Sequence, residues 1–254
     1  MIALIDADHI PYIVCHNKID EPEKTLTECI DGANSYLQGL INGSKADEFH
    51  LFFTIGKNFR YDIYPEYKAN RTKLEKPAYF YDVRDYLMNE YKGISLFNLE
   101  ADDLLCIYKK KYIDESKPYV VVSTDKDINN LEGINYDIKN DVIRIVDKEF
   151  AEQYFWTSLI TGDPAYNIKG IPGKGQAFAK KLWDTCKDSG ESINLYKAKI
   201  ISEYLNYFGE LKGVEEFYKN YKCLKIIDFH DSIQFVPPLN TSLIYAKTLG
   251  MAFE

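Results

Sequence analysis

The chain has 254 residues, with 39 Asp and Glu against 31 Lys and Arg, and a formal net charge of −8. That length predicts one or two domains, and 46% hydrophobic residues argue against wholesale disorder. No apolar stretch is long enough to cross a membrane, and residues 1–5 lead directly into Asp6 and Asp8, which argues against a secretory leader. Judged by bulk charge alone, the chain is also a poor candidate for binding nucleic acid.

The five cysteines are odd in number and dispersed, with no Cys-x-x-Cys pair. We expect buried or incidental thiols in a reducing cytoplasm. The four histidines add no Cys/His cluster at zinc-ligand spacing. Catalysis is therefore expected to depend on carboxylates.

Short apolar runs alternate with helical patterns in the first half of the chain. Strands are predicted at 2–5, 49–54, 94–99 and 119–123, and helices at 26–40, 83–91 and 101–111. Such alternation is typical of βαβ units and predicts an α/β fold with a mostly parallel sheet. Residues 136–138 and 142–146 are expected to form a hairpin at the edge of the sheet.

The pattern becomes helical after about residue 147, with helices predicted at 148–161, 176–187, 192–208 and 214–221. A Gly/Pro-rich loop, residues 162–175, separates the first two of these helices. We therefore divide the chain into an α/β body, residues 1–147, and a helical part, residues 148–254.

Acidic residues follow the predicted strands, at the edge where an open parallel sheet binds its ligands. A single Asp there usually caps a helix, but seven like charges at one edge repel one another unless cations neutralise them. Carboxylate oxygens favour Mg²⁺ or Mn²⁺, and two such ions about 4 Å apart can assist phosphoryl transfer. The residues thus predict a metal-dependent phosphoesterase. The set is Asp6, Asp8, Glu100, Asp102, Asp103, Asp125 and Asp127, with Asp163 in the Gly/Pro loop as an eighth member.

The Gly/Pro loop does not fit a P-loop, because Ile168 and Gly175 stand where that motif requires Gly and Ser or Thr. Its glycines would expose main-chain N–H groups to an anion. Residues 169–187 contain five lysines against one aspartate, which favours contact with a phosphate backbone over an ordinary turn with a solvated face. The lysines are Lys169, Lys174, Lys180, Lys181 and Lys187.

A second basic segment, residues 57–76, contains six Lys and Arg interleaved with aromatic residues. Cations that hold phosphates beside rings that stack on unpaired bases suit a single strand or a frayed end. A solvated loop whose aromatic residues enter the core explains the segment equally well.

Five motifs occur in the order found in 5′→3′ exonucleases and flap endonucleases, and over roughly residues 1–185 the chain resembles the small bacteriophage members of that family. One motif would be weak evidence, whereas five in order are specific. They are Ile5-Asp-Ala-Asp8, Tyr64-Pro-Glu-Tyr-Lys-Ala-Asn-Arg71, Glu100-Ala-Asp-Asp103, Ser123-Thr-Asp-Lys-Asp127 and the loop from Thr161-Gly-Asp163 to Gly175.

The resemblance implies a PIN-like sheet, a helical arch at about 57–92, and a helix–hairpin–helix-type element at about 155–187 that grips duplex DNA, usually with a monovalent cation such as K⁺. It places Lys68 and Arg71 on the scissile phosphate and the Tyr67 ring beside the terminal nucleotides. One metal would lie among Asp6, Glu100, Asp102 and Asp103, and the other among Asp125, Asp127 and Asp163, with Asp8 beside these ligands. The expected DNA-binding residues of the loop and the following helix are Lys169, Gly170, Gly173, Lys174, Gly175, Lys180 and Lys181.

The implied function is hydrolysis of DNA from 5′ ends or flaps, in replication or repair, by a monomer without membrane attachment. The sequence leaves open whether RNA–DNA hybrids are cut and whether replication proteins are partners.

Two departures from the family pattern bear on this expectation. Many relatives carry an Asp just after the second strand, where this chain has Phe53-Thr-Ile-Gly56. The loop motif normally reads Gly-Asp-x-x-Asp-Asn, but Tyr166 replaces its second Asp here. Because a tyrosine supplies no carboxylate at neutral pH, the alternative is a structure-selective DNA-binding protein with weakened catalysis.

A third hypothesis is a haloacid-dehalogenase-like phosphatase, in which Asp6 of Asp6-Ala-Asp8 would be a phosphorylated nucleophile. This hypothesis leaves Glu100–Asp103 and the second basic segment unused. It also expects a strand before Gly162-Asp163, where the pattern is helical.

The distribution of charge reverses the first impression of an acidic chain. The eight carboxylates of the proposed site equal the net charge of −8 in size, so the rest of the chain is neutral. The two basic segments then remain as surfaces for phosphate.

Overall fold

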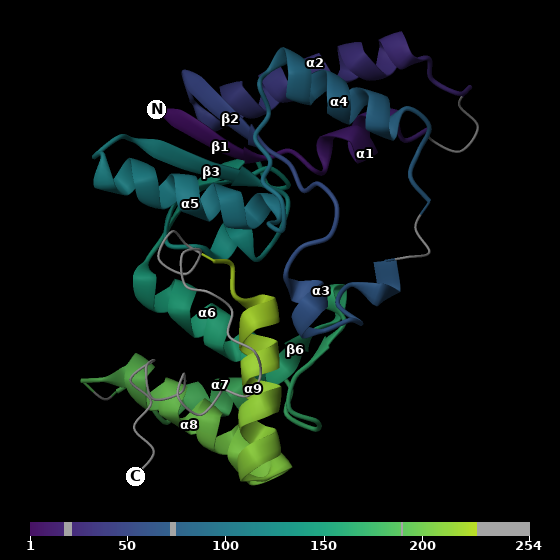
Figure 1. The fold of residues 1–254 in the computed structure, drawn as a ribbon. Coiled ribbons are helices and arrows are strands. Elements are labelled where there is room, and N and C mark those ends of the chain that lie inside the picture. Colours follow the sequence, from purple (N-terminus) through teal and green to yellow (C-terminus); the bar gives the residue numbers. More distant parts are fainter. Residues whose placement is uncertain (18–21, 72–74, 189, 228–254) are drawn as a thin grey trace. The chain divides into compact units, whose positions relative to one another are not determined.

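The computed structural model describes residues 1–17, 22–71, 75–188 and 190–227 (Figure 1). These residues form two compact units: the first comprises 1–58, 75–148 and 226–227, and the second 59–71 and 149–225. The second unit thus includes part of the predicted arch, which we had assigned to the α/β body. Lys73 of the second basic segment and residues 228–254 of the predicted helical part lie outside the described residues.

The first unit is built on a five-stranded sheet in the order β2-β1-β3-β4-β5. Its strands are β1 (Ile2–Asp6), β2 (Glu48–Phe52), β3 (Tyr119–Ser123), β4 (Gly133–Asp137) and β5 (Val142–Val146). Strands β1 to β4 are parallel, and β5 pairs antiparallel with β4 at the edge. The prediction of a mostly parallel sheet that ends in a hairpin is therefore confirmed. In the register of β1, Ile5 lies opposite Leu51 on one side and Val122 on the other.

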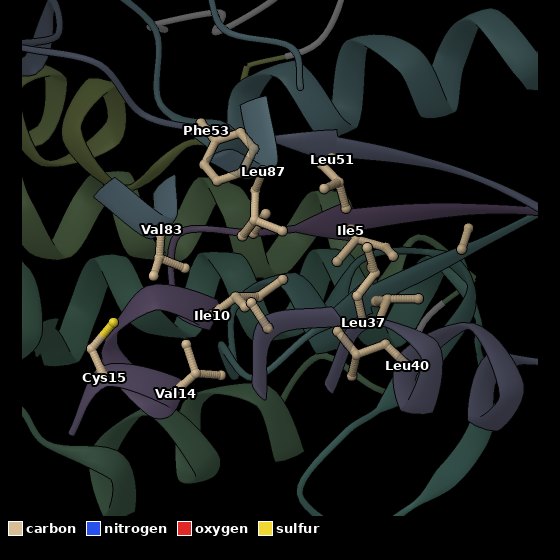
Figure 2. Close-up of a cluster of buried hydrophobic side chains, with 14 of the residues drawn as sticks. Ile5, Ile10, Val14, Cys15, Leu37, Leu40, Leu51, Phe53, Val83 and Leu87 are labelled. Atoms are coloured by element: carbon tan, nitrogen blue, oxygen red, sulfur yellow. The ribbon is translucent and has the colours of Figure 1, made fainter. Parts of the chain in front are cut away.

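Alternate residues of the strands serve two hydrophobic cores, as the period of two in a β-strand requires. Figure 2 shows one core, in which Ile5, Leu51 and Phe53 pack with side chains from three helices. These helices are α1 (Ile10–Cys15), α2 (Leu26–Ser44) and α4 (Phe80–Glu90). On the other face, Leu4, Phe52 and Val121 pack against α5 (Ala101–Asp114), seen across the sheet from α2 and α4 in Figure 1. The sheet is thus covered on both faces, which leaves its strand ends to carry polar side chains.

The segment 94–99 is not a strand, contrary to the prediction. Ile94 forms an isolated bridge with Phe52, and Asn98 forms another with Asn58. Between them the chain turns outward, since Asn98 adopts a left-handed conformation with φ of 70° and Phe97 is 92% exposed. An apolar run predicts burial, but the turn at Asn98 directs part of this run away from the sheet, so that only isolated bridges form.

The second unit is helical apart from one short two-stranded sheet. Its elements are α3 (Arg60–Ile63), η1 (Ala69–Arg71), α6 (Lys148–Thr161), β6 (Gly162–Asp163), η3 (Pro164–Tyr166), β7 (Ile168–Lys169), α7 (Gln176–Asp184), α8 (Ser192–Phe208) and α9 (Glu210–Leu224). The bounds of α6 and α8 agree with the prediction, whereas α9 is longer and α7 ends earlier. An aromatic core that includes Trp156, Tyr196, Tyr204 and Phe217 joins α6, α8 and α9.

The five cysteines are buried, as expected, and within the described residues none of them forms a disulfide. In the part of the chain that the structure describes, no helix has the length and apolar character needed to span a bilayer.

The first unit also contains η2 (Ile128–Asn130), which follows β3 directly after the acidic pair Asp125 and Asp127.

Candidate active site

Three predicted carboxylates of the first unit gather where β1 and β3 end side by side. The hydroxyl group of Ser123, the last residue of β3, donates to Oδ2 of Asp6 at 3.3 Å and accepts the main-chain N–H of Asp125 at 2.9 Å. Oδ1 of Asp6 accepts the main-chain N–H of Asp8 at 3.3 Å. Asp127 joins this group through its N–H, which donates to Oδ1 of Asp125 at 2.8 Å. The i, i+2 acidic pairs after both strands are therefore held by turns of their own.

Thr54 connects this group to the helix that carries the next acidic motif. Its main-chain N–H donates to Oδ1 of Asp8 at 2.9 Å, and its hydroxyl accepts the N–H of Ala101 at 2.9 Å. Because Ala101 is the first residue of α5, the contact fixes the N-terminus of α5 beside the end of β2. Thr54 lies in Phe53-Thr-Ile-Gly56, where the family resemblance led us to expect an Asp, and it places an uncharged hydrogen-bonding residue there.

Asp103 is fully buried, and both of its carboxylate oxygens accept main-chain hydrogen bonds. Oδ2 accepts from Glu100 at 3.1 Å as part of a capping box at the start of α5, and Oδ1 accepts from Ile227 at 3.0 Å. Asp103 therefore holds the described end of the chain against α5, a contact that the Glu100-Ala-Asp-Asp103 motif does not predict. Asp102 is less buried, and its Oδ1 accepts the N–H of Asp103 at 2.8 Å.

The electrostatics of the strand ends favour a proton or another cation on Asp6. Burial is the main cause that raises the pKa of Asp6 to about 7, and the charges of Asp8 and Asp125 add to it. The hydrogen bonds from the Asp8 main chain and the Ser123 hydroxyl act in the opposite direction. Burial lowers the pKa of the adjacent His9 to about 4, so its imidazole is neutral and adds no positive charge at pH 7.

The donor chemistry at the strand ends suits a hard divalent cation, since the carboxylates of Asp6, Asp8 and Asp125 lie close enough for their charges to add to the effect of burial on the pKa of Asp6. Within residues 1–17, 22–71, 75–188 and 190–227, however, no group of three or more His, Cys, Asp and Glu side chains has the spacing of a metal site. The assignment of metal ligands therefore stays a prediction.

The remaining predicted site residues belong to the second unit. Asp163 ends β6, is buried, and accepts the N–H of Ala165 at 2.7 Å, which caps η3. At β6 and β7, Gly162 and Gly170 approach each other so closely that a Cβ on either would overlap main-chain atoms of the other segment. This approach explains two glycines of the loop, whereas Gly173 and Gly175 have open space around them and are exposed.

The lysines of residues 169–187, the first basic segment, differ in their contacts and exposure. Lys174 forms an ion pair with Glu203 on α8, and its Nζ lies 4.7 Å from the centroid of the Phe178 ring. Lys180 and Lys187 both pair with Asp184 on α7. Lys169 and Lys181 are exposed, as is the Lys180 side chain at 75%. Exposed pairs of this kind contribute little to stability, so these cations can exchange partners at small cost.

Two residues of the second basic segment, Tyr67 and Arg60, are buried. The Tyr67 ring is only 1% exposed and packs with Tyr166, Ile168 and Cys223, so in this structure it presents no face to a terminal nucleotide. Arg60 is equally buried, and its guanidinium donates to the carbonyl oxygens of Cys223 at 3.1 Å and Lys225 at 2.9 Å, at the end of α9. For Tyr67 this burial agrees with the alternative in which aromatic residues of the segment enter the core, and its role beside the terminal nucleotides stays a prediction.

Lys68 and Arg71 lie nearer the surface, Lys68 partly buried and Arg71 exposed. Nε of Arg71 donates to the carbonyl oxygen of Ala165 at 3.1 Å, and the N–H of Lys68 donates to that of Tyr166 at 3.0 Å. Both predicted phosphate-binding cations are thus tied to the loop that carries Asp163.

Comparison with known proteins identifies the family. The model of the 5′-3′ exonuclease N-terminal, resolvase-like domain matches residues 1–155. The chain belongs to this family. A 5′-3′ exonuclease of Mycoplasmopsis pulmonis (strain UAB CTIP) is 32% identical over 167 residues, which cover 58% of this chain and 56% of that protein. DNA polymerase I of Mycobacterium leprae (strain TN) is 27% identical over 264 residues, covering 93% of this chain and 29% of the polymerase. The chain therefore matches only part of each of these relatives.

Solved structures agree with the 5′-3′ exonuclease family in fold. The T5 D15 protein co-crystallized with metal ions aligns with a TM-score of 0.57 and 17% identity over 88% of this chain and 95% of that one. A D15 flap endonuclease complex with DNA and metal ions aligns with a TM-score of 0.55 and 17% identity over 88% and 98%. An α/β fold with a mostly parallel five-stranded sheet and a helical C-terminal part is thus shared with these phage proteins. Membership of the exonuclease family favours the nuclease hypothesis over the phosphatase hypothesis, as does the fact that a helix, α6, and not a strand runs directly into Gly162.

Sequence reasoning missed two residues that link the carboxylates of the first unit, Ser123 and Thr54, and one buried residue of the second unit, Arg60. Ser123 was quoted within a motif, but its hydroxyl was not recognised as the link between Asp6 and Asp125. Thr54 could have been found as the residue that stands near a missing Asp. No sequence pattern indicated that Arg60 is buried, because the composition of a basic segment does not distinguish a buried arginine from an exposed one.

Proposed function

We propose that the protein is a metal-dependent 5′ nuclease that hydrolyses phosphodiester bonds of DNA at 5′ ends or flaps. The observation that carries this proposal is the convergence of Asp6, Asp8 and Asp125 at adjoining strand ends, in a chain whose acidic motifs follow the order of the exonuclease family. The named activity of the 5′-3′ exonuclease relative supports the reaction class. The proposal extends to a PIN-like body with an arch at 57–92.

Mg²⁺ or Mn²⁺, when bound, would supply Lewis acidity and neutralise charge on the phosphate. Asp6, with its raised pKa, is the carboxylate that gains most from such a cation, because both burial and its acidic neighbours disfavour its lone negative charge. Ser123 and Thr54 orient Asp6 and Asp8 through the hydrogen bonds described above. The further ligands that we propose are Glu100, Asp102, Asp103, Asp125, Asp127 and Asp163.

DNA would be held by the second unit. The exposed cations Lys169, Lys180 and Lys181, with the loop glycines Gly173 and Gly175, are proposed to contact the phosphate backbone of a duplex. We propose that Lys68 and Arg71 contact the scissile phosphate and stabilise its developing charge. Main-chain carbonyls of a helix–hairpin–helix-type loop would suit K⁺. The D15 flap endonuclease, which shares this fold, was crystallised with DNA and metal ions, and this supports DNA as the partner.

The decisive experiment is incubation of a 5′-labelled flap duplex with the full chain and Mg²⁺ or Mn²⁺. We expect metal-dependent release of 5′ products by the wild type and loss of cleavage in Asp125→Asn with Asp127→Asn. The matched control is Asp114→Asn with Glu115→Gln, which removes two carboxylates from the other end of α5 and should cleave normally. An RNA–DNA hybrid substrate, run in parallel, tests the breadth of the activity.

Two results would contradict the proposal. Tight flap binding without cleavage in either metal would identify the structure-selective DNA-binding protein as the better description. Equal cleavage by the wild type and the doubly substituted variant would show that the reaction does not use the acidic strand ends.

A further inference from the structure

The residue that replaces a family aspartate, Tyr166, lies in a loop tied firmly to the segment 66–71. Four hydrogen bonds join the two: the N–H of Lys68 to the carbonyl of Tyr166 at 3.0 Å, and three from side chains. The side-chain bonds are Asn70 Nδ2 to the carbonyl of Pro164 at 2.6 Å, Arg71 Nε to that of Ala165 at 3.1 Å, and Asn167 Nδ2 to that of Glu66 at 2.9 Å. The two stretches are therefore joined at four points.

The side chain of Tyr166 is part of a core. Its ring is 6% exposed and lies parallel to that of Tyr67, with 5.7 Å between centroids and 8° between planes. Tyr61 packs edge-on against the Tyr67 ring, with 5.5 Å between centroids and 85° between planes. An aspartate at position 166 would lack this contact and would place a carboxylate among apolar groups. Tyrosine is thus the residue that this core accommodates.

Both proposed phosphate-binding cations lie over this pair of rings. Nζ of Lys68 is 4.9 Å from the centroid of Tyr166 and 5.1 Å from that of Tyr67, and Cζ of Arg71 is 5.5 Å from that of Tyr166. These distances are within the range of cation–π attraction. The main chain contributes as well, because Lys68 adopts a left-handed conformation with φ of 53°. A residue other than glycine remains there only where its surroundings hold it, and the hydrogen bond to Tyr166 does so.

A ring holds a cation differently from a carboxylate. The π face attracts the ammonium group but carries no formal charge, so the net positive charge toward an incoming phosphate is kept. An aspartate at the same place would neutralise Lys68 or Arg71 by forming an ion pair with it.

We propose that Tyr166 is a positioning residue, which sets the places of the Lys68 ammonium and the Arg71 guanidinium for phosphate through its ring and its carbonyl oxygen. The role of the two cations in binding phosphate rests on the proposed nuclease function. The contacts by which Tyr166 positions them do not depend on that function. The proposal also explains the departure from the family motif, because Tyr166 replaces a carboxylate with an aromatic ring that two cations contact.

The first test requires no activity. A methylene or ammonium group above an aromatic face is shifted upfield in NMR. The ε-CH₂ signal of Lys68 in ¹³C-lysine-labelled protein, assigned by its loss in Lys68→Arg, should therefore lie upfield of its position in the urea-unfolded protein. Tyr166→Phe should keep that shift, and Tyr166→Leu should reduce it. An unshifted Lys68 signal in the wild type, or the same shift in Tyr166→Leu, would overturn the inference.

The second test uses cleavage of the flap duplex. Tyr166→Leu should lower kcat by about five- to tenfold with less effect on KM, whereas Tyr166→Phe should stay within about twofold of the wild type. Tyr61→Leu is the matched control, because it removes a ring from the same core, edge-on to Tyr67, and should lower stability without this loss of kcat. Equal kcat losses in Tyr61→Leu and Tyr166→Leu would mean a merely structural role.

A double-mutant cycle measures how much of the effect of Tyr166 on cleavage depends on Lys68. Tyr166→Leu should cost less in a Lys68→Met background than in the wild type, because part of its effect passes through Lys68. Independent, multiplicative losses would contradict positioning. A wild type that cleaves no DNA would contradict the proposed function, and the NMR result would then decide the inference alone.

Discussion

Asp6 and Ser123 end neighbouring strands, and the Ser123 hydroxyl is shared between Oδ2 of Asp6 and the N–H of Asp125. One side chain of two heavy atoms thereby sets the distance between the acidic turns that follow β1 and β3. The donated hydrogen bond also counteracts the burial that raises the pKa of Asp6. A small hydroxyl at the end of a central strand therefore acts on the position and the protonation of the carboxylate next to it.

Ser123→Ala should destabilise the metal-free protein by about 1–3 kcal/mol, because Ser123 is fully buried and both of its partners lose a hydrogen bond. The same change should raise the pKa of Asp6 further. Urea unfolding in EDTA measures the first effect, and titration of the Asp6 carboxyl by ¹³C NMR measures the second. Ser192→Ala, at the exposed start of α8, serves as the control and should change neither quantity. An unchanged Asp6 titration in Ser123→Ala would contradict the role assigned to the hydroxyl.

The raised pKa of Asp6 predicts a pH dependence that is opposite to that of an ordinary salt-bridged carboxylate. Between the unfolded value of 3.8 and the folded value of about 7, the native state holds a proton that the unfolded state has lost. The contribution of Asp6 to the free energy of unfolding therefore falls as the pH rises through this window. Asp6→Asn should remove this slope, so the variant should gain stability relative to the wild type from pH 4 to pH 7 in EDTA. Urea midpoints at four pH values test this, and parallel profiles of the two proteins would disprove it.

Local patterns predicted most of the first unit, since its strands are short apolar runs bounded by turn residues and its helices have apolar stripes. The exception, residues 94–99, shows the limit of the method: hydrophobicity indicated a strand, but one bridge to Phe52 and the left-handed Asn98 leave Phe97 in solvent. Whether an apolar run joins a sheet depends on neighbours that are distant in sequence.

The convergence of Asp6, Asp8 and Asp125 follows from their positions in the sequence, because the ends of parallel strands meet at one edge. The burial of Tyr67 and Arg60 could not be predicted with certainty, because composition does not tell which rings and cations of a basic segment enter a core. Tyr166 was recognised only as a missing carboxylate. Its contacts with Lys68 and Arg71 depend on two segments about a hundred residues apart, and no local pattern records them.

Arg60 should be among the most sensitive positions of the second unit. Its buried guanidinium satisfies two carbonyl oxygens at the end of α9, where the helix dipole also favours a positive charge. Arg60→Met should lower the free energy of unfolding by about 2–4 kcal/mol. Arg60→Lys should recover only part of this, because an ammonium group lacks the planar fork that reaches both oxygens. Thermal unfolding of the three proteins tests the order, and a Met variant as stable as the wild type would contradict it.

The loop glycines should separate into two classes. Gly170→Ala should be severely destabilising, because the new Cβ would overlap the carbonyl oxygen of Ile160 and the main-chain nitrogen of Gly162. Gly173→Ala should cost only about 1 kcal/mol, because the space around it is open and the penalty comes from its φ of 79° alone. Differential scanning calorimetry of both variants measures the contrast. Similar melting temperatures for the two would mean that the β6–β7 approach is looser than described.

Asp103 offers a test that separates structure from metal binding. Its two oxygens accept the N–H groups of Glu100 and Ile227, so Asp103→Ala should cost about 2–4 kcal/mol even in EDTA, since two buried donors lose their acceptor. Amide hydrogen exchange at Ile227 should also accelerate. Asp102→Ala, at a less buried neighbour on the same turn of α5, is the control and should leave the exchange at Ile227 unchanged. If Asp103→Ala alters stability only when Mg²⁺ is present, the carboxylate acts as a metal ligand first, and its hydrogen bond to Ile227 contributes little to holding the end of the chain.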